Sequence, residues 1–143
     1  MTRAEGYIGL ARRAGLLETG EENAGIAVRA GKAKLLVLAA DASENARRRA
    51  ENFVFGRPVP LMTAPLSKEE ISDACGKNGC SMIVFTDLGL ADSFVSALAE
   101  ADSGQFGALA QQMHEQKARE AMRKREALSH ARNKKLGKRR KNV

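Results

Sequence analysis

The chain has 143 residues, of which 43% are hydrophobic and 29% are charged, with a net charge of +7. This length predicts a single domain, and the 4% aromatic content with no tryptophan predicts an aliphatic core. No apolar run approaches the ~20 residues of a membrane span, so we expect a cytoplasmic protein with Cys75 and Cys80 reduced.

The charge is distributed unevenly along the chain. Residues 1–104 hold 12 Lys/Arg and 14 Asp/Glu for a net charge of −2, whereas residues 105–143 hold 12 and 3 for +9. Such a basic segment favours a polyanionic partner, most often nucleic acid. The alternative is a solvated charged helix, but +9 over 39 residues is more one-sided than solubility requires. An anionic membrane is disfavoured because the segment lacks bulky aromatic side chains.

Helical spacings alternate with strand-length apolar runs along residues 1–100. Residues 34–40, KLLVLAA, and residues 81–86, SMIVFT, have the continuous apolar character of strands buried on both faces. Ser67 and Glu70 form a capping box at the start of one helix. The alternation predicts an α/β/α sandwich around a parallel or mixed sheet of about four strands. The expected helices are 3–14, 21–30, 44–54, 67–75 and 88–101, with a further short strand at 59–62.

The last third of the chain is predicted to be a separate basic tail. Residues 101–107, ADSGQFG, indicate a linker between a domain at 1–100 and a tail at 108–143. The tail residues favour helix, but the segment from residue 133 is too charged to bury any surface, and we expect it to be disordered in the free protein. The candidate phosphate contacts of the tail are Arg123, Lys124, Arg125, Lys134, Lys135, Lys138, Arg139 and Arg140.

The sequence predicts no catalytic, metal or cofactor site. The segment from Gly25 to Gly31 has five intervening residues where a P-loop has four, and Ala33 stands where that loop binds magnesium through Ser or Thr. Cys75 and Cys80 lie five apart, but zinc takes four ligands and both histidines are in the tail. We therefore interpret both cysteines as small residues packed between a helix and a strand.

Arg47, Arg48 and Arg49 form a second basic patch on a predicted helix of the domain. One interpretation is a phosphate-binding surface. The other is an exposed helix face whose charges pair with Glu44 and Glu51 at helical spacing. The sequence leaves both open.

The order of motifs resembles the YlxQ-type bacterial branch of the "L seven Ae" ribosomal protein superfamily. The resemblance rests on TGEENAGIAVRAGKAKLLVLAADASENARRR, followed by VP, EEISDACGK and MIVFTDLGLA. It covers roughly residues 5–98 and leaves the tail outside. It implies a three-layer α/β/α fold and recognition of kink-turn or similarly bent RNA.

In that family the RNA lies against the start of the second helix, the turn after the central strand and the loop before the last strand, here residues 20–23, 41–43 and 76–79. Strong kink-turn binders carry Gly-Thr-Asn-Glu and then a Lys at the first place. This chain has Glu21-Glu22-Asn23 after Gly20, and Ile26 at the Lys position. Resemblance and charge together imply RNA contacts by Gly20, Glu22, Asn23, Lys32, Lys34, Asp41, Ser43, Arg47, Arg48, Lys77 and Asn78.

We therefore expect a noncatalytic, monomeric RNA-binding protein associated with the ribosome, whose RNA target is structured ribosomal RNA or mRNA. Its domain would recognise RNA shape and its tail would supply salt-sensitive affinity. A first alternative is a protein-interaction adaptor that uses the tail for nonspecific RNA tethering, because Glu21 and Glu22 make the expected face acidic. A second is an enzyme fragment, because domains of this fold resemble the substrate-recognition part of certain RNA methyltransferases.

Overall fold

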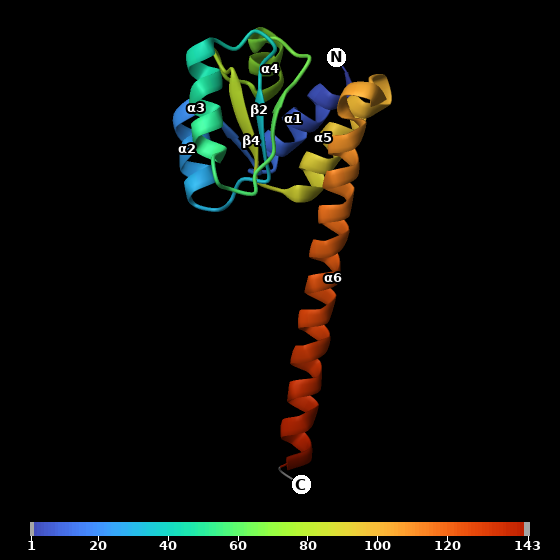
Figure 1. Ribbon diagram of the computed structural model, residues 1–143. Coiled ribbons are helices and arrows are strands. Elements are labelled where there is room, and N and C mark those ends of the chain that lie inside the picture. The colour runs from blue at the N-terminus through green and yellow to red at the C-terminus, as the bar shows by residue number, and fades with distance from the viewer. Residues whose placement is uncertain (1, 142–143) are drawn as a thin grey trace.

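The computed structural model describes residues 2–141, and the side chains of residues 2–135. Within these residues, four strands form one mixed sheet in the order β1-β4-β2-β3 (Figure 1). The elements in chain order are α1 (Arg3–Arg13), β1 (Leu17–Thr19), α2 (Glu21–Arg29), β2 (Leu35–Leu38), α3 (Glu44–Val54), β3 (Leu61–Thr63), α4 (Lys68–Cys75), β4 (Met82–Phe85), α5 (Leu88–Ala101) and α6 (Ser103–Lys141).

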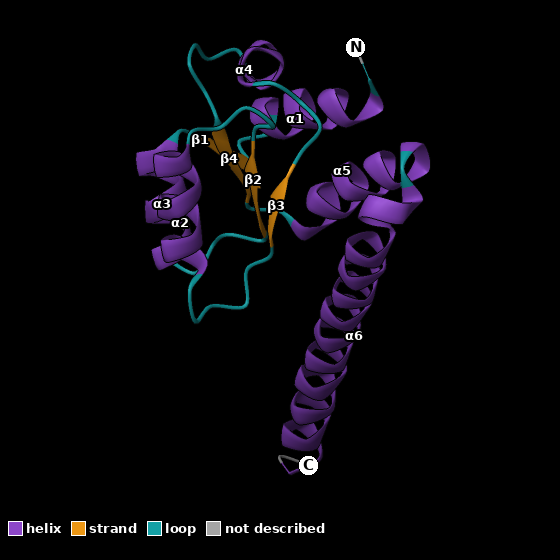
Figure 2. Cartoon of the chain, turned by 45° about the horizontal axis from the view of Figure 1, so that its top comes forward, coloured by secondary structure: helices purple, strands orange, loops and turns teal. Residues whose placement is uncertain are grey.

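The central strands β2 and β4 are buried along their whole length, as their apolar runs predicted. Successive side chains of a strand point to opposite faces, and two separate cores result. Leu35 and Val37 pack with α1, α4 and α5, whereas Leu36 and Leu38 pack with α2 and α3. Figure 2 shows these two groups of helices on opposite sides of the sheet. The three-layer α/β/α sandwich is confirmed.

The predicted linker at residues 101–107 is wrong, because α6 begins at Ser103. Only Asp102 separates α5 from α6, and its side chain accepts a hydrogen bond from the Gln105 N–H at 3.1 Å. Phe106 and Met113 are buried in the same core as α1 and α5. The small and polar residues of this segment indicate a loop locally, but burial of Phe106 overrides that tendency. The first turns of α6 therefore belong to the domain.

A buried carboxylate on α5 anchors α6 to the domain. Asp92 is 3% exposed, and its Oδ1 lies 2.7 Å from His114 Nδ1. Lys117 Nζ lies 3.8 Å from the Asp92 Oδ2. A buried acid needs hydrogen bonds or counter-charges to offset its desolvation. These contacts fix the direction in which α6 leaves the core.

Beyond Lys117, α6 projects away from the domain (Figure 1). Its 39 residues correspond to a rod of about 58 Å at 1.5 Å per residue. The helical backbone continues to Lys141, past the point at residue 133 where the charge density predicted disorder. None of the described helices combines the length and apolar character that crossing a bilayer requires.

Replacing Met113 by Ala should lower the free energy of unfolding by about 2–5 kcal/mol, because Met113 is fully buried between α6 and the core. Urea denaturation followed by circular dichroism would measure the change. The matched control is Met122→Ala on the same helix, where the side chain is 59% exposed and the effect should stay within about 0.5 kcal/mol. Equal effects of the two substitutions would contradict the docking of α6 on the core.

Candidate nucleic-acid interface

Three loops meet at one edge of the sheet because of the strand directions. β4 is antiparallel to both β1 and β2. The ends of β1 and β2 therefore lie beside the start of β4, at the upper edge in Figure 1. We call this the upper edge, and it consists of residues 20–23, 41–43 and 76–81. It contains the three segments that the family resemblance singled out.

Hydrogen bonds from main-chain N–H groups hold the loops of the upper edge together. The Gly20 N–H donates to the Met82 carbonyl at 2.9 Å, and the Ala39 N–H donates to the Ser81 carbonyl at 2.9 Å. The Cys80 N–H donates to the Ser72 Oγ at 2.8 Å, which ties the 76–79 loop to α4. The edge is therefore built on rigid elements, as a recognition surface requires.

The start of α2 differs from the starts of α1, α3, α4 and α5. Thr2, Ser43, Ser67 and Asp87 each accept a hydrogen bond from the first turn of the helix that follows. Gly20 provides no side-chain cap, so the first N–H groups of α2 have no partner of this kind. Such groups, together with the positive end of the helix dipole, attract phosphate and other acceptors.

Gly20 also has a backbone conformation that few other residues adopt. Its φ of 90° and ψ of 160° lie in a region essentially restricted to glycine. A Cβ built on Gly20 would meet no atom within 4 Å, so the surface is open at this point. A polyanion backbone can therefore approach α2 closely here.

The acidic residues at the start of α2 have different environments. Glu21 forms an ion pair with Arg49 of α3, at 2.6 Å between Oε2 and Nη1. Glu22 is exposed, and Asn23 donates from Nδ2 to the Thr19 carbonyl at 3.0 Å. The charge of Glu21 is thus partly compensated inside the protein, whereas Glu22 is exposed to solvent.

The two predicted site residues in the turn after β2 also have structural partners. The Asp41 Oδ1 accepts a hydrogen bond from the Lys68 N–H at 2.7 Å, which joins the turn after β2 to the start of α4. The Ser43 Oγ accepts from the Ala46 N–H at 3.1 Å and caps α3. An open hollow between this turn and the 76–79 loop is lined by Asp41, Lys68, Asn78 and Gly79, among others.

The basic residues near the upper edge are exposed to different degrees. Arg47 is half-buried and lies 3.9 Å from Glu44, while Arg48 is exposed in the second turn of α3. Lys77 and Asn78 are exposed in the loop before β4. Arg47 lies near Glu44 at helical spacing, as the exposed-face interpretation expected, whereas Arg49 pairs with Glu21 of α2 and not with Glu51.

Lys32 and Lys34 do not join the other predicted residues. They precede β2, and the Lys34 N–H donates to the Phe85 carbonyl at the end of β4, at 2.8 Å. This places them at the opposite edge of the sheet, about 20 Å from Asp41 along β2. The local sequence marks both lysines as basic, but only the strand topology determines the edge at which they lie. We call the edge formed by residues 28–34 and 55–60 the lower edge.

The tail candidates Arg123, Lys124, Arg125, Lys134 and Lys135 are exposed on α6 beyond its docked segment. The side chains of Lys138, Arg139 and Arg140 lie outside the described residues. Asp92, His114 and Lys117, which orient the helix, were not expected from the sequence. An acid at helical spacing on the apolar face of 88–101 was the only available signal for Asp92.

Both cysteines are buried where α4 approaches the start of β4, as predicted. Burial, together with the neighbouring Cys75, raises the pKa of the Cys80 thiol to about 11. Cys80 therefore stays a protonated thiol at neutral pH, which is the opposite of what a nucleophilic cysteine needs. Among the described residues, no three His, Cys, Asp or Glu side chains gather as a metal site would require.

Asp41→Ala should lower the free energy of unfolding by about 1 kcal/mol, because it removes the acceptor at the first turn of α4. The control is Asp73→Ala, an exposed acid on the same helix, with an expected change within about 0.5 kcal/mol. Thermal or urea unfolding would compare the two variants. A loss no larger than that of the control would mean that the Asp41–Lys68 contact adds no stability.

Comparisons with known proteins agree with this architecture. Residues 2–95 match the model of the "Ribosomal protein L7Ae/L30e/S12e/Gadd45 family". "RNA-binding protein YlxQ" of Enterococcus faecium is 40% identical over 75 residues, which are 52% of this chain and 72% of that protein.

Two solved structures have a similar fold. One is a protein of unknown function from Bacillus halodurans, with a TM-score of 0.63 and 25% identity over 68% of this chain and 97% of that one. The other is the Giardia lamblia 15.5kD RNA binding protein, with a TM-score of 0.54 and 17% identity over 69% and 84%. The family model spans about two thirds of the chain and covers the whole sheet, so the protein belongs to the L7Ae/L30e/S12e/Gadd45 family, in its YlxQ-type branch.

Proposed function

We propose that this protein is a noncatalytic RNA-binding protein that recognises kink-turn-like RNA with the upper edge of its sheet. The observation that carries the proposal is the uncapped start of α2 at Gly20, placed beside two further loops on a rigid edge. Donor groups at a helix start, together with an open glycine, suit an RNA backbone that bends sharply.

Base recognition would use the polar side chains around that start. Glu22 can accept from exocyclic amino groups, and the exposed amide of Asn78 can both donate and accept. Arg48 on α3 and Lys77 in the loop before β4 are both exposed and would contact phosphates. Ile26, exposed at 52%, supplies no charge at the position where strong kink-turn binders of the family have Lys.

The basic part of α6 would add affinity without sequence preference. Each phosphate neutralised by Lys or Arg releases counterions and makes binding salt-dependent. This division of roles suits a cytoplasmic, monomeric protein acting on ribosomal RNA or on ribosome-associated RNA. The similar proteins of Enterococcus faecium and Giardia lamblia are both named as RNA-binding proteins, which supports RNA as the ligand.

The full chain should prefer a kink-turn hairpin to a blunt RNA duplex, and Glu22→Ala combined with Lys77→Ala should abolish that preference. The pair leaves the net charge unchanged, so duplex affinity should stay within about twofold. Fluorescence anisotropy with both RNAs measures the ratio. Glu51→Ala with Arg12→Ala, which removes the same kinds of charge from exposed positions away from the upper edge, should keep the preference.

If the wild-type chain shows no preference for the hairpin over the duplex, the proposed recognition is wrong. RNA-independent association with one protein would then favour the adaptor function.

Ending the chain after Lys117 should weaken binding to hairpin, duplex and single strand alike, and should flatten the salt dependence of each. This end point keeps Phe106, Met113 and the contacts of Asp92, and unchanged thermal unfolding would verify that the domain is intact. Affinity titrations at two or more salt concentrations give the slopes. An unaltered slope would show that the projecting part of α6 does not bind phosphates.

A further inference from the structure

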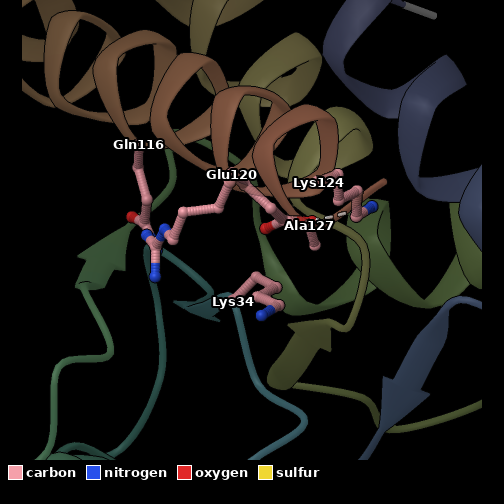
Figure 3. Close-up of a pocket in the computed structure, with 6 residues that line it drawn as sticks. Lys34, Gln116, Glu120, Lys124 and Ala127 are labelled. Atoms are coloured by element: carbon pink, nitrogen blue, oxygen red, sulfur yellow. Dashed lines mark ion pairs between the residues drawn. The ribbon is translucent and has the colours of Figure 1, made fainter. Parts of the chain in front are cut away.

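A cleft separates the projecting part of α6 from the lower edge of the sheet. Its α6 wall carries Gln116, Arg119 and Arg123, and its domain wall carries Lys34 and Arg57. Three adjoining hollows are lined by these residues, and Gln116 lines all of them, so they form one continuous groove. Figure 3 shows Gln116 and Glu120 extending from α6 toward Lys34 on the domain. The family model ends at residue 95, before this wall begins.

Both walls of the cleft are basic. Lys34 and Arg57 face Arg119, Arg123 and Lys124 across the groove. The only acid that lines these hollows is Glu120, whose Oε1 lies 3.2 Å from Lys124 Nζ. The basic side chains lie on both sides of the groove, and its one acid is paired with Lys124. Such a groove attracts a phosphate chain more strongly than a single exposed helix face does.

The domain wall is preorganised. Arg57 donates from Nη1 to the Val28 carbonyl at 3.2 Å, which holds its guanidinium against the lower edge. A guanidinium has five N–H donors, so this bond leaves others for a phosphate. Lys34 is half-buried, and its backbone is held by the hydrogen bond of its N–H to the Phe85 carbonyl.

Part of the domain wall of the cleft is apolar, which favours bases over a closed duplex. Pro58, Val59 and Pro60, which follow Arg57 in the sequence, line the cleft. Phe55, two residues before Arg57, lines none of the three hollows, but it is 86% exposed, more than any other large apolar residue with a described side chain. A basic groove with an apolar surface and an exposed aromatic ring is the arrangement that binds single-stranded nucleic acid.

We propose that the cleft between α6 and the lower edge binds a single-stranded segment of RNA, separate from the kink-turn contact at the upper edge. The phosphates lie between Arg119 and Arg123 on α6 and Lys34 and Arg57 on the domain. The bases lie over the segment 58–60, and Phe55 stacks on one of them. The proposal rests on the RNA binding proposed above, but it uses a different edge of the sheet.

The test is fluorescence anisotropy of the full chain with a 12-nucleotide oligouridylate, a blunt duplex and a kink-turn hairpin without overhang. Arg119→Ala with Arg123→Ala should weaken oligouridylate binding about 10- to 30-fold at 0.1 M salt and lower the salt slope by about 1.4, because two phosphate contacts are lost. Binding of the hairpin should change about threefold or less.

The matched control is Arg125→Ala with Arg132→Ala. These arginines are exposed on the same helix, and at 100° per residue they point away from the cleft. This pair removes the same charge, and its effect on oligouridylate should be about threefold or less. Equal losses from the two pairs would overturn the cleft and leave only a diffuse basic helix.

Two single substitutions in or near the cleft should change the affinity for oligouridylate in opposite directions. Glu120→Gln should tighten oligouridylate binding by about two- to fivefold, because it removes the one acid from the wall. Glu126→Gln, at an exposed position on the flank of α6 that lines none of the three hollows, should have a smaller effect. Phe55→Ala should weaken oligouridylate about fivefold or more and leave the hairpin unaffected. A tighter variant cannot be explained by misfolding.

The outcomes separate this proposal from the kink-turn proposal. Loss of hairpin preference with cleft-dependent oligouridylate binding would refute the upper-edge function alone. Hairpin preference with no binding of oligouridylate would refute the cleft alone. Cleft-dependent binding of the duplex, without binding of the single strand, would also overturn the assignment to single-stranded RNA.

Discussion

The pairing of β2 with β4 is the constraint on which the rest of the structure depends. Both strands are four residues long and buried throughout, so neither face of the sheet can remain uncovered. Their antiparallel register, Leu35 opposite Phe85 and Leu38 opposite Met82, brings the turn after β2 beside the loop before β4. The pairing of β1 with the other side of β4 then adds Gly20, hydrogen-bonded to Met82, to the same upper edge.

The second constraint is the buried carboxylate of Asp92. Its position on α5 would be unfavourable without His114 and Lys117, and both of these residues lie on α6. The core thus requires the first turns of α6, and those turns set the angle of the basic rod. Because the rod leaves toward the lower edge, its arginines come to face Lys34 and Arg57.

Local chemistry made most of the fold predictable. The apolar runs at 34–40 and 81–86 identified the central strands, and the Ser67–Glu70 capping box is present as expected. Tertiary contacts could not be predicted in the same way. The segment 101–107 has the composition of a loop, yet burial of Phe106 makes it helical. Lys34 and Asp41 are near neighbours in sequence, but a strand between them sends them to opposite edges of the sheet.

Two RNA-binding surfaces at opposite edges would compensate for what the upper edge lacks. Ile26 supplies no phosphate contact, and Glu22 adds local repulsion, so the upper edge alone would bind RNA modestly. Two contacts with one RNA raise the overall affinity above that of either contact when the geometry allows both to form at once. The reason is that the second binding event is then intramolecular. The Asp92 anchor holds α6 at a fixed distance from the upper edge, which keeps that geometry constant. The projecting helix would then act as a second, oriented contact rather than as a diffuse charged tail, and RNAs with a bend and an adjacent single strand would be selected over either feature alone.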